Sequence, residues 1–148
     1  MPRQNELTEL AAPLEQDVDT VGLQDFLDAM GSALVAGDDA AAAALWEMPA
    51  YAVSPDMAHV IHSQAQLQLM FAAARERYYA RGVTDTQPEI VRLDEINDQI
   101  VMVRVHWPWI DGKGRIVGGE TSTYTLQRDD EGDWKVRVAV AHGAEAVS

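Results

Sequence analysis

Hydrophobic side chains in the first part of the chain recur every three or four positions, which is the spacing of one helix face. The first such stretch begins near Thr20 and stops at Gly37-Asp38-Asp39, where a glycine ends one helix and an aspartate caps the next. Its apolar positions are Leu23, Phe26, Leu27, Met30 and Leu34. This pattern predicts a first amphipathic helix.

A short helix and a hairpin are predicted next. The alanine run 40–44 has high helix propensity and extends to Trp46. Pro49 ends this helix, because a proline disfavours helical geometry in the residue before it. The segments 51–53 and 59–61 then flank a Ser-Pro-Asp turn, which is typical of a small hairpin.

A longer helix begins at the capping box formed by Ser63 and Gln66, and Gly82 closes it. One stripe of this helix is apolar and should face the interior. The stripe consists of Leu67, Met70, Phe71, Ala74 and Tyr78.

The rest of the chain has the composition of strands, with many β-branched and aromatic residues. Four such segments cover residues 89–93, 100–110, 117–127 and 134–141, and short turns rich in Asn, Asp and Gly separate them. The predicted fold class is α+β, with three N-terminal helices packed on a curved antiparallel sheet. We expect one domain over residues 20–148, preceded by an arm of residues 1–19 that is either a frayed tail or a short docked helix.

Alternation along the strands assigns their faces, because successive side chains point to opposite sides of a sheet. The sets expected to face inward are Val101, Val103, Val105, Trp107 and Trp109; Glu120, Ser122, Tyr124 and Leu126; and Trp134, Val136, Val138, Val140 and His142. Pro108 cannot donate to the sheet ladder, so it should mark a bulge, a bend or an edge, and the sheet should curve there.

The charge of the chain narrows the classes of partner that it can bind. It has 24 acidic residues against 11 Lys and Arg, a formal net charge of -13, which disfavours nucleic acid and membrane surfaces. It has no cysteine, which removes disulfides and thiolate metal sites. We expect no cofactor. The polar N-terminus and the lack of a long apolar run favour the cytoplasm.

The order of these parts resembles the nuclear transport factor 2-like superfamily, and within it the SnoaL-like branch. The landmarks lie between Val21 and His142: a helix reaching Gly37-Asp38, the sequence Leu45-Trp46-Glu47-Met48-Pro49, the hairpin, the helix ending at Gly82, and four strands containing Val105-His106-Trp107, Asp111-Gly112-Lys113-Gly114, Ser122-Thr123-Tyr124-Thr125-Leu126 and Asp133-Trp134-Lys135-Val136. The resemblance implies a cone-shaped domain, a pocket between helices and concave sheet, and frequently a homodimer through the sheets. Its members include isomerases, cyclases, dehydratases, binding modules and subunits without chemistry, so the fold does not choose among them.

One feature of the resembling enzymes is missing. The ketosteroid isomerases and polyketide cyclases of the superfamily use a pocket carboxylate as a base, often just after the second helix. Here the segment 48–53 contains no Asp or Glu. On a helix, Glu47 would be turned about 100° from Trp46, toward solvent. The isomerase hypothesis is weakened accordingly.

The expected pocket is mainly aromatic, as small-molecule sites often are. Its candidate ligand-binding residues are Trp46, Tyr51, Met70, Tyr78, Trp107, Trp109 and Ser122, and its candidate catalytic residues are His142, Glu120 and Tyr124. The alternative is that the aromatic residues are ordinary core.

Each candidate for chemistry has a second interpretation. His142 could transfer protons, or simply bond a neighbouring carbonyl. Glu120 could orient His142, act as the base, or be a rim charge. Tyr78 and Tyr124 could donate to a carbonyl or enolate oxygen, or satisfy internal partners.

The remaining histidines are not expected to act in the pocket as the sequence stands. His59 and His62 do not form a helical ligand pair, so no metal site is expected. Arg104 and His106 suit a dimer interface or open solvent, and His106 would line the pocket only if Pro108 shifted the strand register.

Two functions remain. The first is a ligand-binding domain of the SnoaL-like kind, whose enzymatic form would be an isomerase, cyclase or dehydratase acting on a hydrophobic carbonyl compound. The second is a non-catalytic dimeric module. The aromatic pocket favours binding of a small hydrophobic ligand, and the sequence leaves open whether the protein is an enzyme.

Overall fold

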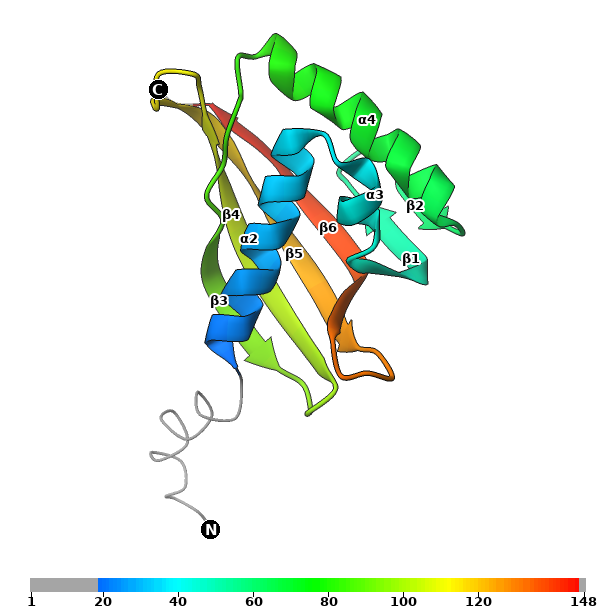
Figure 1. Cartoon of the computed structure of the whole chain (residues 1–148). Helices are drawn as coiled ribbons and strands as arrows, with labels where there is room; N and C mark the ends of the chain where they lie inside the picture. Colours follow the sequence, from blue (N-terminus) through cyan, green and yellow to red (C-terminus); the bar gives the residue numbers. More distant parts are fainter. Residues whose placement is uncertain (1–18, 147–148) are drawn as a thin grey trace, which may run out of the picture.

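A computed structural model describes residues 19–146 of this chain, in which helices pack against one curved sheet (Figure 1). The elements are α2 (Thr20–Ala36), α3 (Asp39–Ala43), β1 (Trp46–Val53), β2 (Ala58–Ile61), α4 (Gln64–Ala80), β3 (Glu89–Glu95), β4 (Ile100–Ile110), β5 (Ile116–Arg128) and β6 (Trp134–Ala146). The predicted α+β class with three helices is confirmed. The predicted arm of residues 1–19 lies outside the described residues, apart from Asp19.

The helix ends follow from local side-chain chemistry. The Asp19 carboxylate accepts the backbone N–H of Gly22 at 2.8 Å and caps α2, whose end is Gly37 in the left-handed region at φ 78°. The predicted cap of α4 is present, since the Ser63 hydroxyl accepts the backbone N–H of Gln66 at 3.1 Å. Each bond satisfies a donor that the helix itself leaves unpaired.

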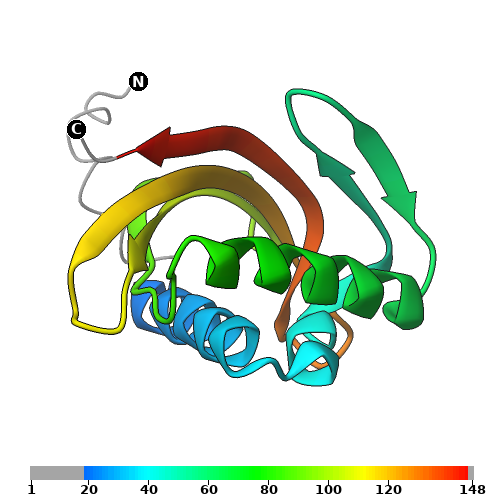
Figure 2. The same ribbon diagram turned by 90° about the horizontal axis from the view of Figure 1, so that it is seen from above.

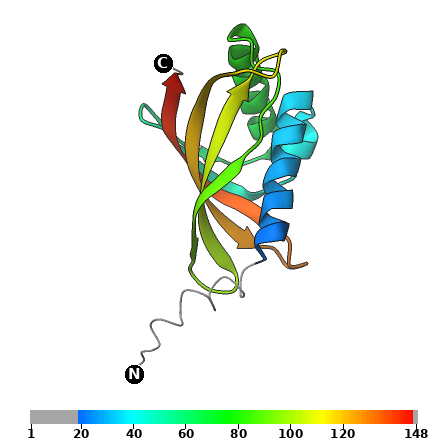
Figure 3. The same cartoon turned by 90° about the vertical axis from the view of Figure 1, so that its left-hand side faces the viewer.

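The sheet has six strands in the order β2-β1-β6-β5-β4-β3. Strands β3 to β6 form the predicted antiparallel meander, and β1 and β2 form the predicted hairpin. β1 also pairs parallel with β6, which the sequence pattern does not predict. In Figure 2 the sheet arches over the helices, which cover only its concave face, and Figure 3 shows α2 and α4 on that one side.

The short helix ends earlier than predicted. It stops at Ala43, and Trp46 begins β1 instead of lying on a helix. The cause is tertiary: the Leu45 carbonyl accepts the backbone N–H of Val136, which draws the chain into the sheet despite its helix propensity. Glu47 is exposed as expected, but the reason differs from the predicted one. Glu47 and Trp46 are neighbours in a strand, and such neighbours point to opposite faces.

The predicted faces of β4 and β5 are correct. Trp107 pairs with Glu120, Val105 with Ser122 and Val103 with Tyr124, all on the inner face. Pro108 does not reverse the alternation, because both Trp107 and Trp109 remain buried. It lies past the end of the β3 pairing, so no ladder bond is lost there.

The predicted inner face of β6 is wrong beyond Val136. Leu126 pairs with Val136, but Thr125 pairs with Val138, so Arg137 is an extra residue that reverses the alternation. Val138 and Val140 therefore point outward and alanines take the inner positions. His142 is the extra residue of a second bulge between the pairs Ser122–Ala141 and Thr121–Gly143.

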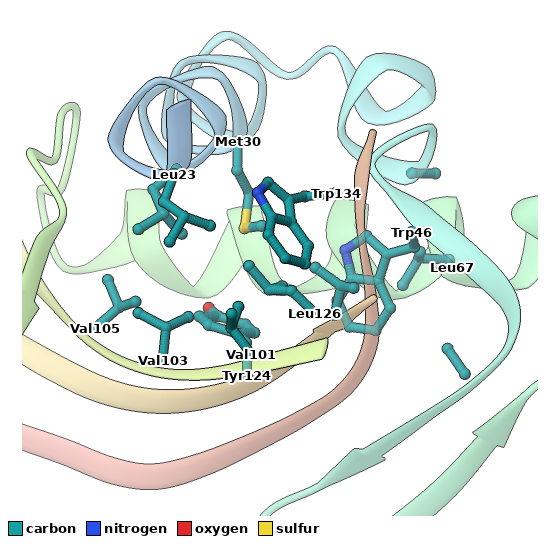
Figure 4. Close-up of a cluster of buried hydrophobic side chains, with 14 of the residues drawn as sticks. Leu23, Met30, Trp46, Leu67, Val101, Val103, Val105, Tyr124, Leu126 and Trp134 are labelled. Atoms are coloured by element: carbon teal, nitrogen blue, oxygen red, sulfur yellow. The ribbon is translucent and has the colours of Figure 1, made fainter. Parts of the chain in front are cut away.

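The core lies between the helices and the concave face (Figure 4). Leu23 and Met30 of α2 and Leu67 of α4 meet side chains from β4, β5 and β6 there. The residues with no exposed surface include Leu23, Leu27, Ile61, Val103, Val105, Leu126 and Val136. Hydrophobic burial of this kind is the main stabilising contribution in a chain without disulfides.

No helix in residues 19–146 combines the length and the apolar character that crossing a membrane requires.

Candidate functional site

A cavity of about 260 Å³ lies beside the core, between the C-terminal half of α4, the end of α2, the segment 83–86 and the inner face of β4 and β5. Its aromatic lining comes from Phe71, Tyr78, Tyr79, Trp107, Trp109 and Tyr124. Because exposed residues such as Tyr79 and Asp85 line it together with buried ones, the cavity reaches the surface. A cavity of about 150 Å³ already holds benzene, so this one accommodates a ligand with a single ring.

The carboxylate of Glu120 lies in the wall that β5 contributes. The Tyr78 hydroxyl, from α4, donates to Glu120 Oε2 at 2.5 Å. The Trp109 indole N–H, from β4, is 3.5 Å from the same oxygen, at the limit of a hydrogen bond. The rings of Tyr78 and Trp109 meet edge to face with centroids 5.7 Å apart. Side chains from two other elements, α4 and β4, therefore hold this carboxylate in place.

A second polar pair lies deeper in the cavity. The Trp107 indole N–H donates to the Tyr124 hydroxyl at 3.0 Å, and the two rings pack edge to face with centroids 6.4 Å apart. Trp107 is 6 % exposed and Tyr124 8 %. Their register partners are inner-face residues of adjacent strands, so the sheet itself sets their positions.

Tyr78, which is partly buried, and Tyr124, which is buried, both stay neutral near physiological pH. Burial raises the pKa of Tyr78 far above its ordinary value of 10, and the negative charge of Glu120 raises it further. Burial also raises the pKa of Tyr124, more than its hydrogen bonds with Ser122 and Trp107 lower it. These side chains therefore act as O–H groups and not as phenolates.

The rim carries charged and polar groups. Arg75 of α4 lines the cavity and forms a bidentate ion pair with Asp39 of α3, with N–O distances of 2.5 and 3.1 Å. Asp85 is exposed, and one of its oxygens accepts the backbone N–H of Thr86 at 2.8 Å. The Thr86 hydroxyl is buried and has no partner within residues 19–146.

Comparison with known proteins identifies the family. The model of the family described as NTF2-like protein (DUF6841) matches residues 18–144. The chain belongs to this family. A search of the curated proteins finds no match.

Solved structures share the NTF2-like fold at low sequence identity. A domain of unknown function with a cystatin-like fold from Nostoc punctiforme has a TM-score of 0.67 and 16% identity, over 88% of this chain and 78% of that one. An NTF-2 like protein of unknown function from Shewanella oneidensis has a TM-score of 0.64 and 14% identity, over 85% of this chain and 100% of that one. A ketosteroid isomerase-like protein from Erwinia carotovora atroseptica has a TM-score of 0.63 and 16% identity, over 86% of this chain and 95% of that one.

Six of the candidate residues meet at the cavity of this NTF2-like protein. They are Tyr78, Trp107, Trp109, Glu120, Ser122 and Tyr124. All but Tyr78 come from β4 and β5, where the alternation predicted the faces correctly. The cavity carboxylate thus comes from β5, and not from the segment after the second helix.

Four other candidates do not line the cavity. Trp46 packs in the core against Phe71 with ring centroids 6.1 Å apart, and Met70 also packs against the core. Tyr51 is 41 % exposed, because its position on β1 pairs with the outward Val138.

His142 is the fourth, and its expected inward orientation is wrong. Ala141 lines the cavity in its place. The bulge after Val136 moves His142 to the outer side, where its Nε2 lies 2.7 Å from the Thr123 hydroxyl oxygen. Thr123 belongs to the outward set of β5, so the imidazole is separated from Glu120 by the sheet.

Sequence reasoning missed several lining residues. Phe71 and Ala74 had a signal, because both belong to the apolar stripe predicted for the long helix. Arg75 and the segment 83–86 had none, since Arg75 lies outside that apolar stripe and the place of the segment follows from how the chain leaves α4. In the described part of the chain, no group of three or more His, Asp or Glu side chains could hold a metal ion.

Proposed function

We propose that this NTF2-like protein binds a small, largely hydrophobic molecule, with one polar group of the ligand directed at Glu120. The observation that carries the proposal is an aromatic cavity of about 260 Å³ with a carboxylate held in its wall. Ligand sites generally combine an apolar lining with a few fixed polar groups. The finer form of the proposal is a ligand-binding domain of the SnoaL-like kind that acts in the cytoplasm.

Filling the cavity tests this proposal. Ala74 lines the cavity on α4, whereas its neighbour Ala73 is exposed on the same helix. Propylbenzene should bind the wild type at a single saturable site in calorimetry, Ala74→Phe should abolish binding, and Ala73→Phe should retain it. Equal binding by the two variants, or no binding by the wild type, would contradict the proposal.

Acid–base catalysis on a hydrophobic carbonyl compound is the second candidate, as in an isomerase, cyclase or dehydratase. It is supported by the position of the Glu120 carboxylate in the cavity, and by the fold shared with a ketosteroid isomerase-like protein. Glu120 would remove a proton from the carbon beside the carbonyl and return it. In deuterated water, wild type should then exchange that proton of benzyl methyl ketone faster than Glu120→Gln does; equal rates would exclude this role.

A homodimer through the outer sheet face is a third proposal, and it is compatible with either ligand role or with a non-catalytic module. Exposed apolar side chains on that side of the sheet support it: Tyr51, Val60, Met102 and Val140. Arg104 lies two positions after Met102 on the same strand, and therefore on the same face. Sedimentation of the wild type should report a dimer, and Val140→Lys should shift it toward monomer; a wild-type monomer would contradict the proposal.

A further inference from the structure

Three polar aromatic side chains of the cavity already direct their donors at partners inside the protein. The Tyr78 hydroxyl donates to Glu120, and the Trp107 indole donates to the Tyr124 hydroxyl at 3.0 Å. The Trp109 indole is directed at the same Glu120 oxygen at 3.5 Å. A ligand carbonyl that took one of these three donors would displace an internal bond, and a displaced polar group that stays buried costs free energy.

The cavity also offers acceptors. Both donors to Glu120 reach Oε2, and no donor from residues 19–146 reaches Oε1. A carboxylate accepts several hydrogen bonds, so Oε1 is suited to a donor from the ligand. The buried Thr86 hydroxyl, without a partner in the same range, lines the same cavity and can accept a hydrogen bond as well as donate one.

The charges around the cavity favour a cation. The ionisable acids and bases in its lining, tyrosines aside, are Arg75, Asp85 and Glu120. Arg75 is neutralised by its bidentate pair with Asp39, whereas Asp85 is exposed at the rim. Two carboxylates therefore line the path inward, on a chain with a formal net charge of -13.

Aromatic faces add to this preference, because the face of an indole or phenol ring attracts a cation. The Arg81 guanidinium, an exposed cation outside the cavity lining, already occupies one face of the Trp109 ring, 5.1 Å from its centroid, so the preference depends on the other rings. Phe71, Tyr78 and Trp107 supply further rings in the cavity wall.

We propose that the ligand of this cavity is an amine: an apolar body that carries a protonated nitrogen, which donates to Glu120. This inference rests on the proposed ligand-binding function and specifies its chemical class. The preference should appear as affinity for an ammonium group over an uncharged group of the same size.

Three probes with one ring and similar size separate the classes. Phenethylamine is protonated at neutral pH, propylbenzene replaces its ammonium group by a methyl group, and benzyl methyl ketone offers only an acceptor. Wild type should bind phenethylamine about tenfold to a hundredfold more tightly than the other two, the usual range for a charge-assisted hydrogen bond.

Two matched variants assign the preference to the cavity carboxylate. Glu120→Gln keeps the size of the side chain and removes its charge, so the preference for phenethylamine should disappear while propylbenzene still binds. Glu131→Gln, at an exposed position in the turn before β6, changes the net charge equally and should keep the preference.

The outcomes distinguish this inference from the proposed function. If propylbenzene or the ketone binds as tightly as phenethylamine, or if Glu120→Gln keeps the preference, the amine class is wrong and the binding function stands. If no probe binds the wild type, the binding function fails, and the amine class fails with it.

Discussion

The two ends of the space between helices and sheet are both built from aromatic residues, yet one end is filled and the other is open. At the packed end, Trp46 and Trp134 join the aliphatic core. At the open end, Trp107 and Trp109 line the cavity with Tyr78, Tyr124 and Glu120. Phe71 lies between the two ends, touching Trp46 on one side and the cavity on the other.

The difference lies in the polar tips of the rings. At the open end, the Trp107 indole N–H has an acceptor in Tyr124, and the Trp109 indole N–H is directed at Glu120. At the packed end, the Trp46 indole nitrogen is buried without a partner in residues 19–146. Aromatic content therefore does not separate core from cavity in this chain, whereas the polar partners of the Trp46, Trp107 and Trp109 indoles do differ between the two ends.

The largest expected effect comes from removing a ring at each end. Trp46→Ala should lower the free energy of unfolding by about 3–5 kcal/mol, as is usual for a large buried aromatic. Trp109→Ala should cost less, on the order of 1–3 kcal/mol, because part of its ring borders open space. Urea unfolding at neutral pH measures both. A greater loss for Trp109→Ala would reverse the distinction between the two ends.

The hydrogen bond between Tyr78 and Glu120 gives the next effect. Tyr78→Phe should cost about 1.5–3 kcal/mol, since the bond is made to a charged acceptor. Its neighbour Tyr79 bonds a backbone carbonyl at 3.2 Å from an exposed position, so Tyr79→Phe should cost less. Both variants can be compared by urea unfolding at neutral pH, and equal losses would contradict the assigned bond.

The same pair predicts a pH dependence with a definite sign. The pKa of Tyr78 is raised in the folded state, so above the unfolded value of about 10 the unfolded chain loses a proton that the native chain keeps. Stability should therefore fall as pH rises beyond about 10. The fall should be shallower in Tyr78→Phe than in wild type, and identical slopes would refute this origin.

A smaller change acts on the cavity wall alone. A Cβ added at Gly118 would come within 2.7 Å of Trp109 Cε3, whereas one added at Gly112 would meet nothing within 4 Å. Gly118→Ala should cost about 1–3 kcal/mol by overpacking and displace the Trp109 ring, and Gly112→Ala should not displace it. Near-ultraviolet circular dichroism and propylbenzene binding measure the displacement. Unchanged signals in Gly118→Ala would mean that the added methyl group does not displace the Trp109 ring.

How much the sequence could predict differs between the elements. Alternation in β4 and β5 was sufficient to place Trp107, Glu120 and Tyr124 on one face, because these two strands pair regularly along most of their length. It failed in β6, because an extra residue at Arg137 reverses every later face and leaves no mark in the hydrophobic pattern. Trp46 was misplaced for another reason: pairing with β6 overrode the helix propensity of the alanines before it.

The smallest expected effect tests the two faces of the sheet at His142. Its imidazole is exposed and meets the Thr123 hydroxyl oxygen at 2.7 Å on the side away from the cavity. His142→Ala should therefore change the free energy of unfolding by no more than about 0.5 kcal/mol and leave the affinity for propylbenzene unaltered. The neighbouring Ala141→Phe should abolish that binding, because Ala141 lines the cavity. A loss of binding in His142→Ala with none in Ala141→Phe would mean that the bulge in β6 is absent and the original alternation holds.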